Sequence, residues 1–174
     1  MGADPLYRRI LGPEFERLPD VLRDFHSGPR EAEGKFNVTL AGGVFRYLAR
    51  TFARLPNKPY AGKGILDVES TPPGEVWTRD IGDWRFKTRQ WESDGFLFEK
   101  NRLLTLVFNV ERTAEGMSFR QVRASWWKLP LPKLFAPRIT ADVFAFGNEW
   151  EVTVRIAMPL VGEVVRYEGR LAPL

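Results

Sequence analysis

Hydrophobic and polar residues alternate along most of the chain from Gly64 onward. From 150 to 156 every second residue is apolar, and polar residues such as Glu151 lie between them. The same two-residue period recurs from 104 to 110 and from 139 to 145. Because successive side chains of a strand point to opposite faces of a sheet, this period predicts strands that bury one face.

Short sequences rich in Gly, Pro, Asp and Asn separate the alternating runs, as turns do. The one long interruption is 129–137, whose three prolines disfavour a strand and predict a rim loop or a lid. The strands predicted in this way are 35–41, 65–70, 75–81, 84–93, 95–100, 103–112, 117–128, 139–147, 149–158 and 163–171.

Helical periodicity is confined to the N-terminal part of the chain. Segment 6–11 and a stretch beginning after Leu18 are short, and segment 44–55 has the stronger pattern. We expect this last helix to pack its apolar side against the sheet, and we favour that position over one on an anionic membrane surface. Its apolar stripe is Val44, Leu48, Phe52 and Leu55, and its arginines, on another face, are Arg46, Arg50 and Arg54.

These elements predict an α+β fold in a single domain, residues 1–174. N-terminal helices precede a strongly curved, mostly antiparallel sheet or partly open β-barrel of about nine or ten strands. One helix packs on its concave side or end. A lipocalin-like closed barrel and a helix-grip arrangement are the alternatives, and the lack of a long C-terminal helical pattern argues against the second.

Composition limits the function classes. The net charge of +4 and pI near 9.6 are a mild bias, too diffuse to predict nucleic-acid binding. The N-terminal sequence lacks the layout of a signal peptide, so we expect a cytoplasmic protein. With no cysteine and one histidine, we expect no metal site. No Gly-rich dinucleotide fingerprint is present, so we expect no bound cofactor.

Several short motifs resemble an uncharacterised bacterial family known as domain of unknown function 4166. The resemblance implies a discrete module, found alone or fused to saccharopine-dehydrogenase-like proteins, and implies no activity. Such a dehydrogenase-like protein is therefore an expected partner. The motifs are Leu6-Tyr7-Arg8-Arg9-Ile10-Leu11-Gly12, Leu18-Pro19 with Phe25-His26, Trp77-x-Arg79, Phe98-Glu99, Leu129-Pro130-x-Pro132, and Pro159-Leu160-x-Gly162-x-x-x-Arg166-Tyr167-x-Gly169.

A cation on a strand face that also carries a large aromatic residue is the best candidate for a ligand site. Trp77 and Arg79 share such a face. The acids available from other predicted strands to pair with the guanidinium are Glu99, Asp67, Glu69 and Glu151. Arg166 stands beside Tyr167 on the last predicted strand. Each arginine, if buried, needs a carboxylate from the protein or an anion from a ligand. A structural ion pair is the competing interpretation.

Two further residues are candidates on different grounds. His26 is the only histidine and is a weak candidate for a general acid or base, although a histidine at a helix end explains it as well. Trp126, next to Trp127 and the proline-rich loop, is a candidate for an exposed binding residue.

Three functions are compatible with these observations. The first is a non-catalytic module that binds a small, partly apolar or anionic ligand between sheet and helix. The second is an enzyme of the cyclase, isomerase or hydrolase kind that uses the same pocket. The third is a protein-interaction module that docks on the dehydrogenase-like partner through 126–137. Membrane contact is disfavoured.

Overall fold

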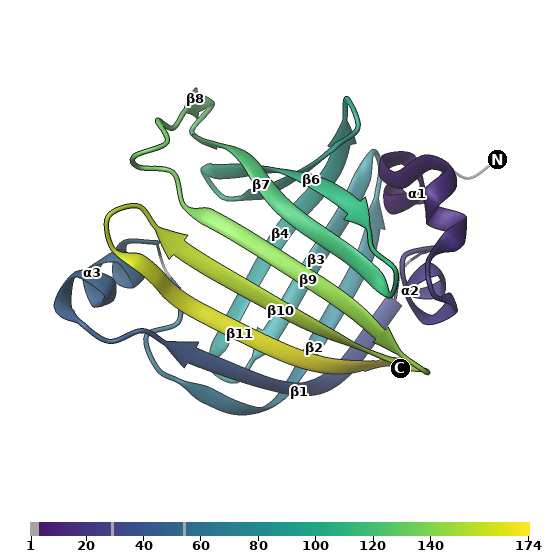
Figure 1. The fold of residues 1–174 in the computed structure, drawn as a ribbon, viewed down its shortest axis with the longest axis horizontal. Helices are drawn as coiled ribbons and strands as arrows, with labels where there is room; N and C mark the ends of the chain where they lie inside the picture. The colour runs from purple at the N-terminus through teal and green to yellow at the C-terminus, as the bar shows by residue number, and fades with distance from the viewer. Residues whose placement is uncertain (1–3, 29, 54) are drawn as a thin grey trace.

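The chain forms a β-barrel with a cluster of short helices at one end (Figure 1). The computed structural model describes residues 4–28, 30–53 and 55–174, apart from the side chains of residues 52 and 53. The helical elements are α1 (Leu6–Leu11), the 3-10 helix η1 (Gly12–Arg17), α2 (Asp20–Phe25) and α3 (Val44–Ala53). The strands are β1 (Arg30–Leu40), β2 (Tyr60–Thr71), β3 (Gly74–Ile81), β4 (Trp84–Ser93), β5 (Phe96–Asn101), β6 (Leu104–Arg112), β7 (Gly116–Trp126), β8 (Leu129–Pro130), β9 (Arg138–Phe146), β10 (Glu149–Met158) and β11 (Gly162–Pro173).

Ten antiparallel strands close into the barrel. Strands β1 to β7 pair in chain order, β7 pairs with β9, β9 with β10, β10 with β11, and β11 returns to β1. Of the strands in the described residues, only the two-residue β8 lies outside this ring, paired with β7. The predicted antiparallel sheet is confirmed, and closure removes the free sheet edges that a partly open barrel would leave. Because the helices are few and short, the fold is mostly β.

The predicted alternation sets the two surfaces of the barrel. Phe108, Val154 and Ile156 point inward and are buried, whereas Arg85 and Lys87 point outward and are exposed. Two of the outward basic residues of β4 lie near acids of β3 and β2: Arg85 lies 3.3 Å from Asp80, and Lys87 lies 3.8 Å from Glu69.

Two inward glycines of neighbouring strands leave no space for a side chain. Gly34 of β1 faces Gly64 of β2, and a Cβ on Gly34 would stand 1.9 Å from the carbonyl oxygen of Arg170. The ring of Phe36 covers Gly64, where a Cβ would come within 2.4 Å of the ring. Gly64 therefore allows close packing of Phe36, and Gly34 allows the close approach of β11 to β1.

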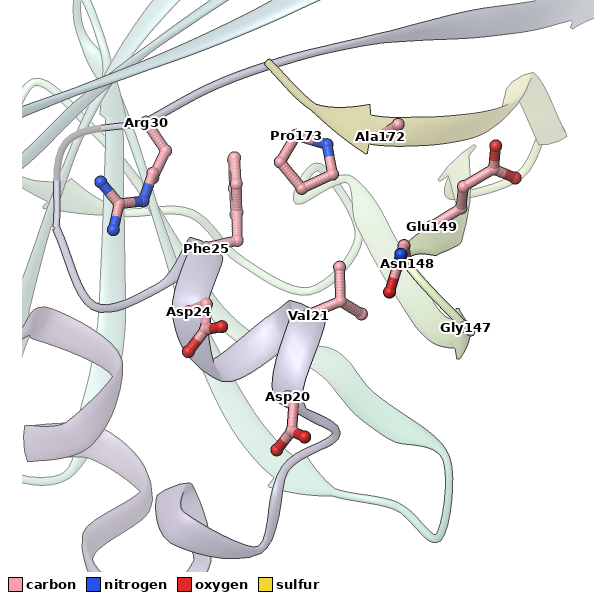
Figure 2. A pocket seen from close by; sticks show the side chains of 10 residues that line it. All are labelled: Asp20, Val21, Asp24, Phe25, Arg30, Gly147, Asn148, Glu149, Ala172 and Pro173. Carbon is pink, nitrogen blue, oxygen red and sulfur yellow. The ribbon is translucent and has the colours of Figure 1, made fainter.

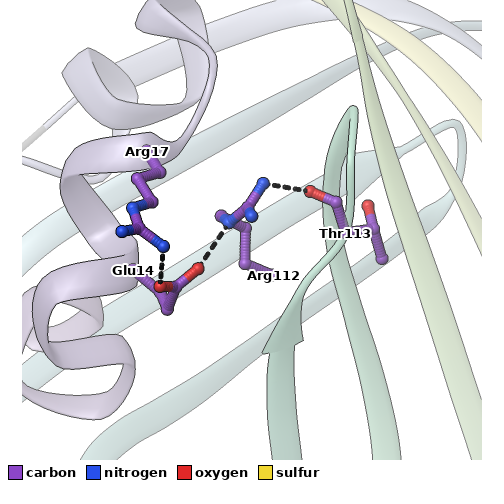
Figure 3. Close-up of polar contacts among 4 residues, drawn as sticks. All are labelled: Glu14, Arg17, Arg112 and Thr113. Carbon is purple, nitrogen blue, oxygen red and sulfur yellow. Dashed lines mark hydrogen bonds and ion pairs between the residues drawn. The ribbon is translucent and has the colours of Figure 1, made fainter.

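Helices α1, η1 and α2 close one end of the barrel, which we call the α1 end. Tyr7, Phe15 and Leu22 from these helices are fully buried in the core. An ion pair ties the helices to the barrel: Arg112 at the end of β6 donates to Glu14 over 2.8 Å, and Arg17 reaches the same carboxylate (Figure 3). The described chain begins and ends at this end of the barrel (Figure 1).

Helix α3 lies at the opposite end, which we call the α3 end, and its orientation differs from the expectation. Val44 and Leu48 of the predicted apolar stripe are exposed, whereas Arg50 is buried. Of the hydrophobic side chains in segment 44–55 that the structure describes, only Ala49 and Leu55 pack against the core cluster. The side chain of Phe52 and the whole of Arg54 lie outside the described residues. The prediction that the apolar side covers the sheet is therefore wrong for Val44 and Leu48.

Candidate functional site

An ion pair lies inside the barrel at mid-depth. Arg79 of β3 points inward, and its Nη1 lies 3.2 Å from a carboxylate oxygen of Glu99 and donates to the Thr88 hydroxyl over 2.9 Å. The side chains of Arg79 and Glu99 each keep 16% of their surface accessible to solvent. Both contacts use the same nitrogen, so the pair leaves part of the guanidinium open to the barrel interior.

Aromatic rings surround this guanidinium. The Arg79 carbon Cζ lies 5.2 Å from the ring centroid of Trp77 and 4.9 Å from that of Phe86, both within cation–π range. Tyr167 of β11 faces the same region and meets Trp84 edge to face, with centroids 5.9 Å apart. Burial raises the pKa of the Tyr167 hydroxyl to about 12, and Arg79 partly offsets that rise. The hydroxyl therefore stays protonated at neutral pH.

Several inward side chains in the α3 half of the barrel are accessible to solvent. Near the α1 end, inward residues such as Trp77, Leu97 and Trp150 are buried. In the other half, strand register points a further set of apolar residues inward, yet these remain only half-buried. They are Leu40, Tyr60, Trp84, Phe86, Leu104, Leu106 and Ile139.

A second polar group lies deeper, against the α1 end. The Tyr7 hydroxyl donates to the Gln90 side chain over 3.1 Å, and the indole of Trp77 donates to Glu75 over 2.9 Å. Burial raises the pKa of Tyr7 well above its usual value and raises that of Glu75 despite the bond from Trp77. Thr88, Glu75 and Gln90 were not predicted as site residues. Their inward positions on the alternating segments 75–81 and 84–93 are the signal that could have identified them.

His26 does not reach the accessible half of the interior. It caps the end of α2, where its ring lies 4.0 Å from that of Tyr7 and stacks on Trp77 at 5.7 Å. The side chain is buried, and desolvation lowers its pKa from 6.5 to about 3. At neutral pH it is therefore an uncharged core residue. Among the described residues, no three His, Asp or Glu side chains gather in a way that could hold a metal ion.

The structure brings together four of the predicted ligand residues and separates two. Trp77, Arg79, Glu99 and Tyr167 all face the interior. Arg166 points outward, on the opposite face of β11 from Tyr167, and lies 3.2 Å from Glu163, so the structure does not bring it together with Arg79. Trp126 takes an inward register at the α3 end of β7 and is 45% exposed.

Two surface hollows lie away from this interior. One, of about 660 Å³, is formed by α2, the turn between β9 and β10, and the C-terminal residues (Figure 2). The other, of about 440 Å³, lies beside β1, β2 and Leu174. Asp20 and Asp24 bring two carboxylates to the first hollow. Neither hollow includes Arg79 or Arg166, so neither is the predicted pocket between sheet and helix.

Residues 18–171 match the family described as Domain of unknown function (DUF4166). No curated protein and no solved structure matches the chain.

Proposed function

The chain belongs to the DUF4166 family, a membership that assigns no activity, and we propose from the barrel interior that it is a non-catalytic binding module. Its ligand is small and partly apolar, enters from the α3 end, and directs a polar or anionic group at Arg79. The observation that carries this proposal is the inward guanidinium of Arg79, which is partly accessible and flanked by aromatic rings.

The physical argument starts from the cost of an inward charge. A guanidinium among apolar side chains is costly to desolvate, and Glu99 offsets that cost through Nη1 only. A ligand carboxylate or carbonyl would accept a hydrogen bond from the remaining edge, since the planar guanidinium presents several donors. Phe86 and Trp84 would cover the apolar part of the ligand. Ligand sites commonly combine such an apolar lining with a few placed polar groups.

The enzyme alternative has less support. Its histidine candidate, His26, is uncharged at neutral pH and is enclosed by Tyr7 and Trp77. The cytoplasmic location expected from the sequence, and the dehydrogenase-like partner, remain proposals.

Tryptophan fluorescence tests the proposal, because Trp77 and Trp84 stand beside Arg79. We would titrate the protein with fatty acids of increasing chain length below their micellar concentration. Arg79→Met alone would leave the Glu99 carboxylate without its ion-pair partner in the interior, so the informative variant is Arg79→Met with Glu99→Gln. Loss of one charge-assisted hydrogen bond should weaken binding by about 1.5–3 kcal/mol.

Two matched variants locate the site. Arg166→Met removes a guanidinium from the outside of the barrel and should leave fatty-acid affinity unchanged. Ala141→Phe adds volume at an inward, half-buried position of β9, level with Tyr167, and should lower affinity. Equal affinity in the wild type, the double variant and Ala141→Phe would show that the barrel interior is not the binding site.

A further inference from the structure

Large apolar side chains are exposed at the α3 end of the barrel. Phe45 on α3 is 78% exposed, Trp127 after β7 is 71% exposed, and Leu160 in the turn between β10 and β11 is 90% exposed. These three segments lie at the same end of the barrel (Figure 1). We call the exposed apolar residues of these three segments the apolar rim. The rim consists of Val44, Phe45, Tyr47, Leu48, Trp126, Trp127, Leu129, Leu134, Phe135 and Leu160.

Helix α3 is fixed with its apolar side outward. Arg46 donates to the carbonyl of Val161 over 3.1 Å, and Arg50 donates to the carbonyls of Ala41 and Val164 over 2.7 and 3.3 Å. These hydrogen bonds attach the side of α3 that carries the arginines to the α3 end of the barrel. An amphipathic helix normally faces its own core with its apolar side. The reversed orientation exposes Val44, Phe45 and Leu48 together, which is a costly arrangement unless another surface covers them.

The same end is strongly basic. Its connections are 41–59, 82–83, 102–103, 127–137 and 159–161, and their only acidic residue is Asp83. The cations Lys58, Arg102, Lys128 and Lys133 are exposed and form no ion pair with any residue within 4–28, 30–53 or 55–174. This end therefore combines apolar side chains with unpaired cations. Such a combination is complementary to a surface that has an anionic outer layer and an apolar layer below it.

We propose that the apolar rim docks on the surface of an anionic lipid bilayer. Phe45, Trp127 and Leu160 enter the boundary between headgroups and acyl chains, and the four unpaired cations contact the headgroups. No helix among the described residues has the length and the apolar run needed to cross a membrane. A bilayer fits better than a protein partner because the rim residues protrude from three separate segments and lie among exposed cations. This inference reverses the expectation from sequence, and it does not depend on the proposed interior ligand.

Co-sedimentation with vesicles tests the proposal. The full chain should bind vesicles of phosphatidylcholine mixed with phosphatidylglycerol more tightly than vesicles of phosphatidylcholine alone. Raising the salt concentration should weaken binding. Lys128→Glu and Lys133→Glu together should lower affinity about 25-fold or more, since each cation near an anionic surface contributes about fivefold. Phe45→Ser with Trp127→Ser should lower it by roughly tenfold or more, because both rings lose their apolar contact.

Matched variants at other places on the barrel serve as controls. Phe146→Ser and Leu174→Ser replace exposed apolar residues of the α1 end, and Lys35→Glu reverses an exposed charge on the outside of β1; all three should bind vesicles as the wild type does. Fatty-acid binding should survive in the rim variants, and vesicle binding should survive in Arg79→Met with Glu99→Gln.

Three results would overturn the membrane proposal. One is a wild-type chain that stays in the supernatant with anionic vesicles. The second is equal binding by rim variants and wild type. The third is a chain that binds no vesicles but binds a dehydrogenase-like protein, with that binding lost in the rim variants. This result would identify the rim as a protein interface.

Discussion

Acidification should destabilise this barrel through its single histidine, before most carboxylates titrate. Burial between Tyr7 and Trp77 lowers the pKa of His26 from 6.5 to about 3. Below pH 6.5 the unfolded imidazole therefore takes up a proton while the native one does not. The contribution of the neutral imidazole to the unfolding free energy is fully present above pH 6.5, and it is lost as the pH falls toward 3. The expected loss of unfolding free energy is about 2 kcal/mol by pH 5 and about 3 kcal/mol by pH 4.

Urea unfolding of the wild type and of His26→Phe across this pH range isolates the contribution of His26 to the pH dependence of the unfolding free energy. The variant keeps an aromatic ring in the site and removes its titration. The opposing contribution of Glu75, whose raised pKa lets the native state take up a proton first, is present in both proteins. The stability difference between the two should therefore fall steadily from pH 7 to pH 4. A flat difference would refute the reasoning, as would a ring proton resonance of folded His26 that titrates near pH 6.5.

Three other predictions follow from packing and sequence. Phe108→Ala should lower the unfolding free energy by about 3–5 kcal/mol, because this inward residue is buried, whereas exposed Phe146→Ala should have little effect; thermal or urea denaturation compares them. Gly34→Ala should cost more than the ~1 kcal/mol of an average substitution, because its Cβ would meet the Arg170 carbonyl, and Gly28→Ala, with open space around it, is its control. Calorimetric titration should detect no binding of NAD or NADP to the chain, and micromolar affinity for either would contradict the sequence argument.

Most strands were predictable because burial of one strand face makes apolar and polar residues alternate in the sequence. The segments 84–93 and 149–158 coincide with β4 and β10. Strand β1, however, begins at Arg30 rather than at 35, because Ala32 and Gly34 face inward between polar residues and are too small to mark a strand. Closure of the ring was not predictable, since the pairing of β7 with β9 spans the proline-rich segment 127–137 and depends on long-range geometry.

The site was partly predictable for a similar reason. Periodicity placed Trp77 and Arg79 on one face, and the structure brings that face inside. The same argument failed for Arg166, because Val164 and Val165 are both fully buried and local burial does not identify the inner face of β11. It also failed for α3. An amphipathic pattern reveals that a helix has an apolar side, but not that Arg50 bonds backbone carbonyls and turns that side outward.

The described chain begins and ends at the α1 end, which has a practical consequence for how the protein can be handled (Figure 1). An affinity tag, a fluorescent protein or a fused enzyme attached at either terminus would project from the side opposite Phe45 and Trp127. Immobilisation through such a tag would leave every copy with the same face toward the solution. A sensor surface prepared in this way would present the rim to injected vesicles, whereas a chain coupled at random through its lysines would lose part of that face.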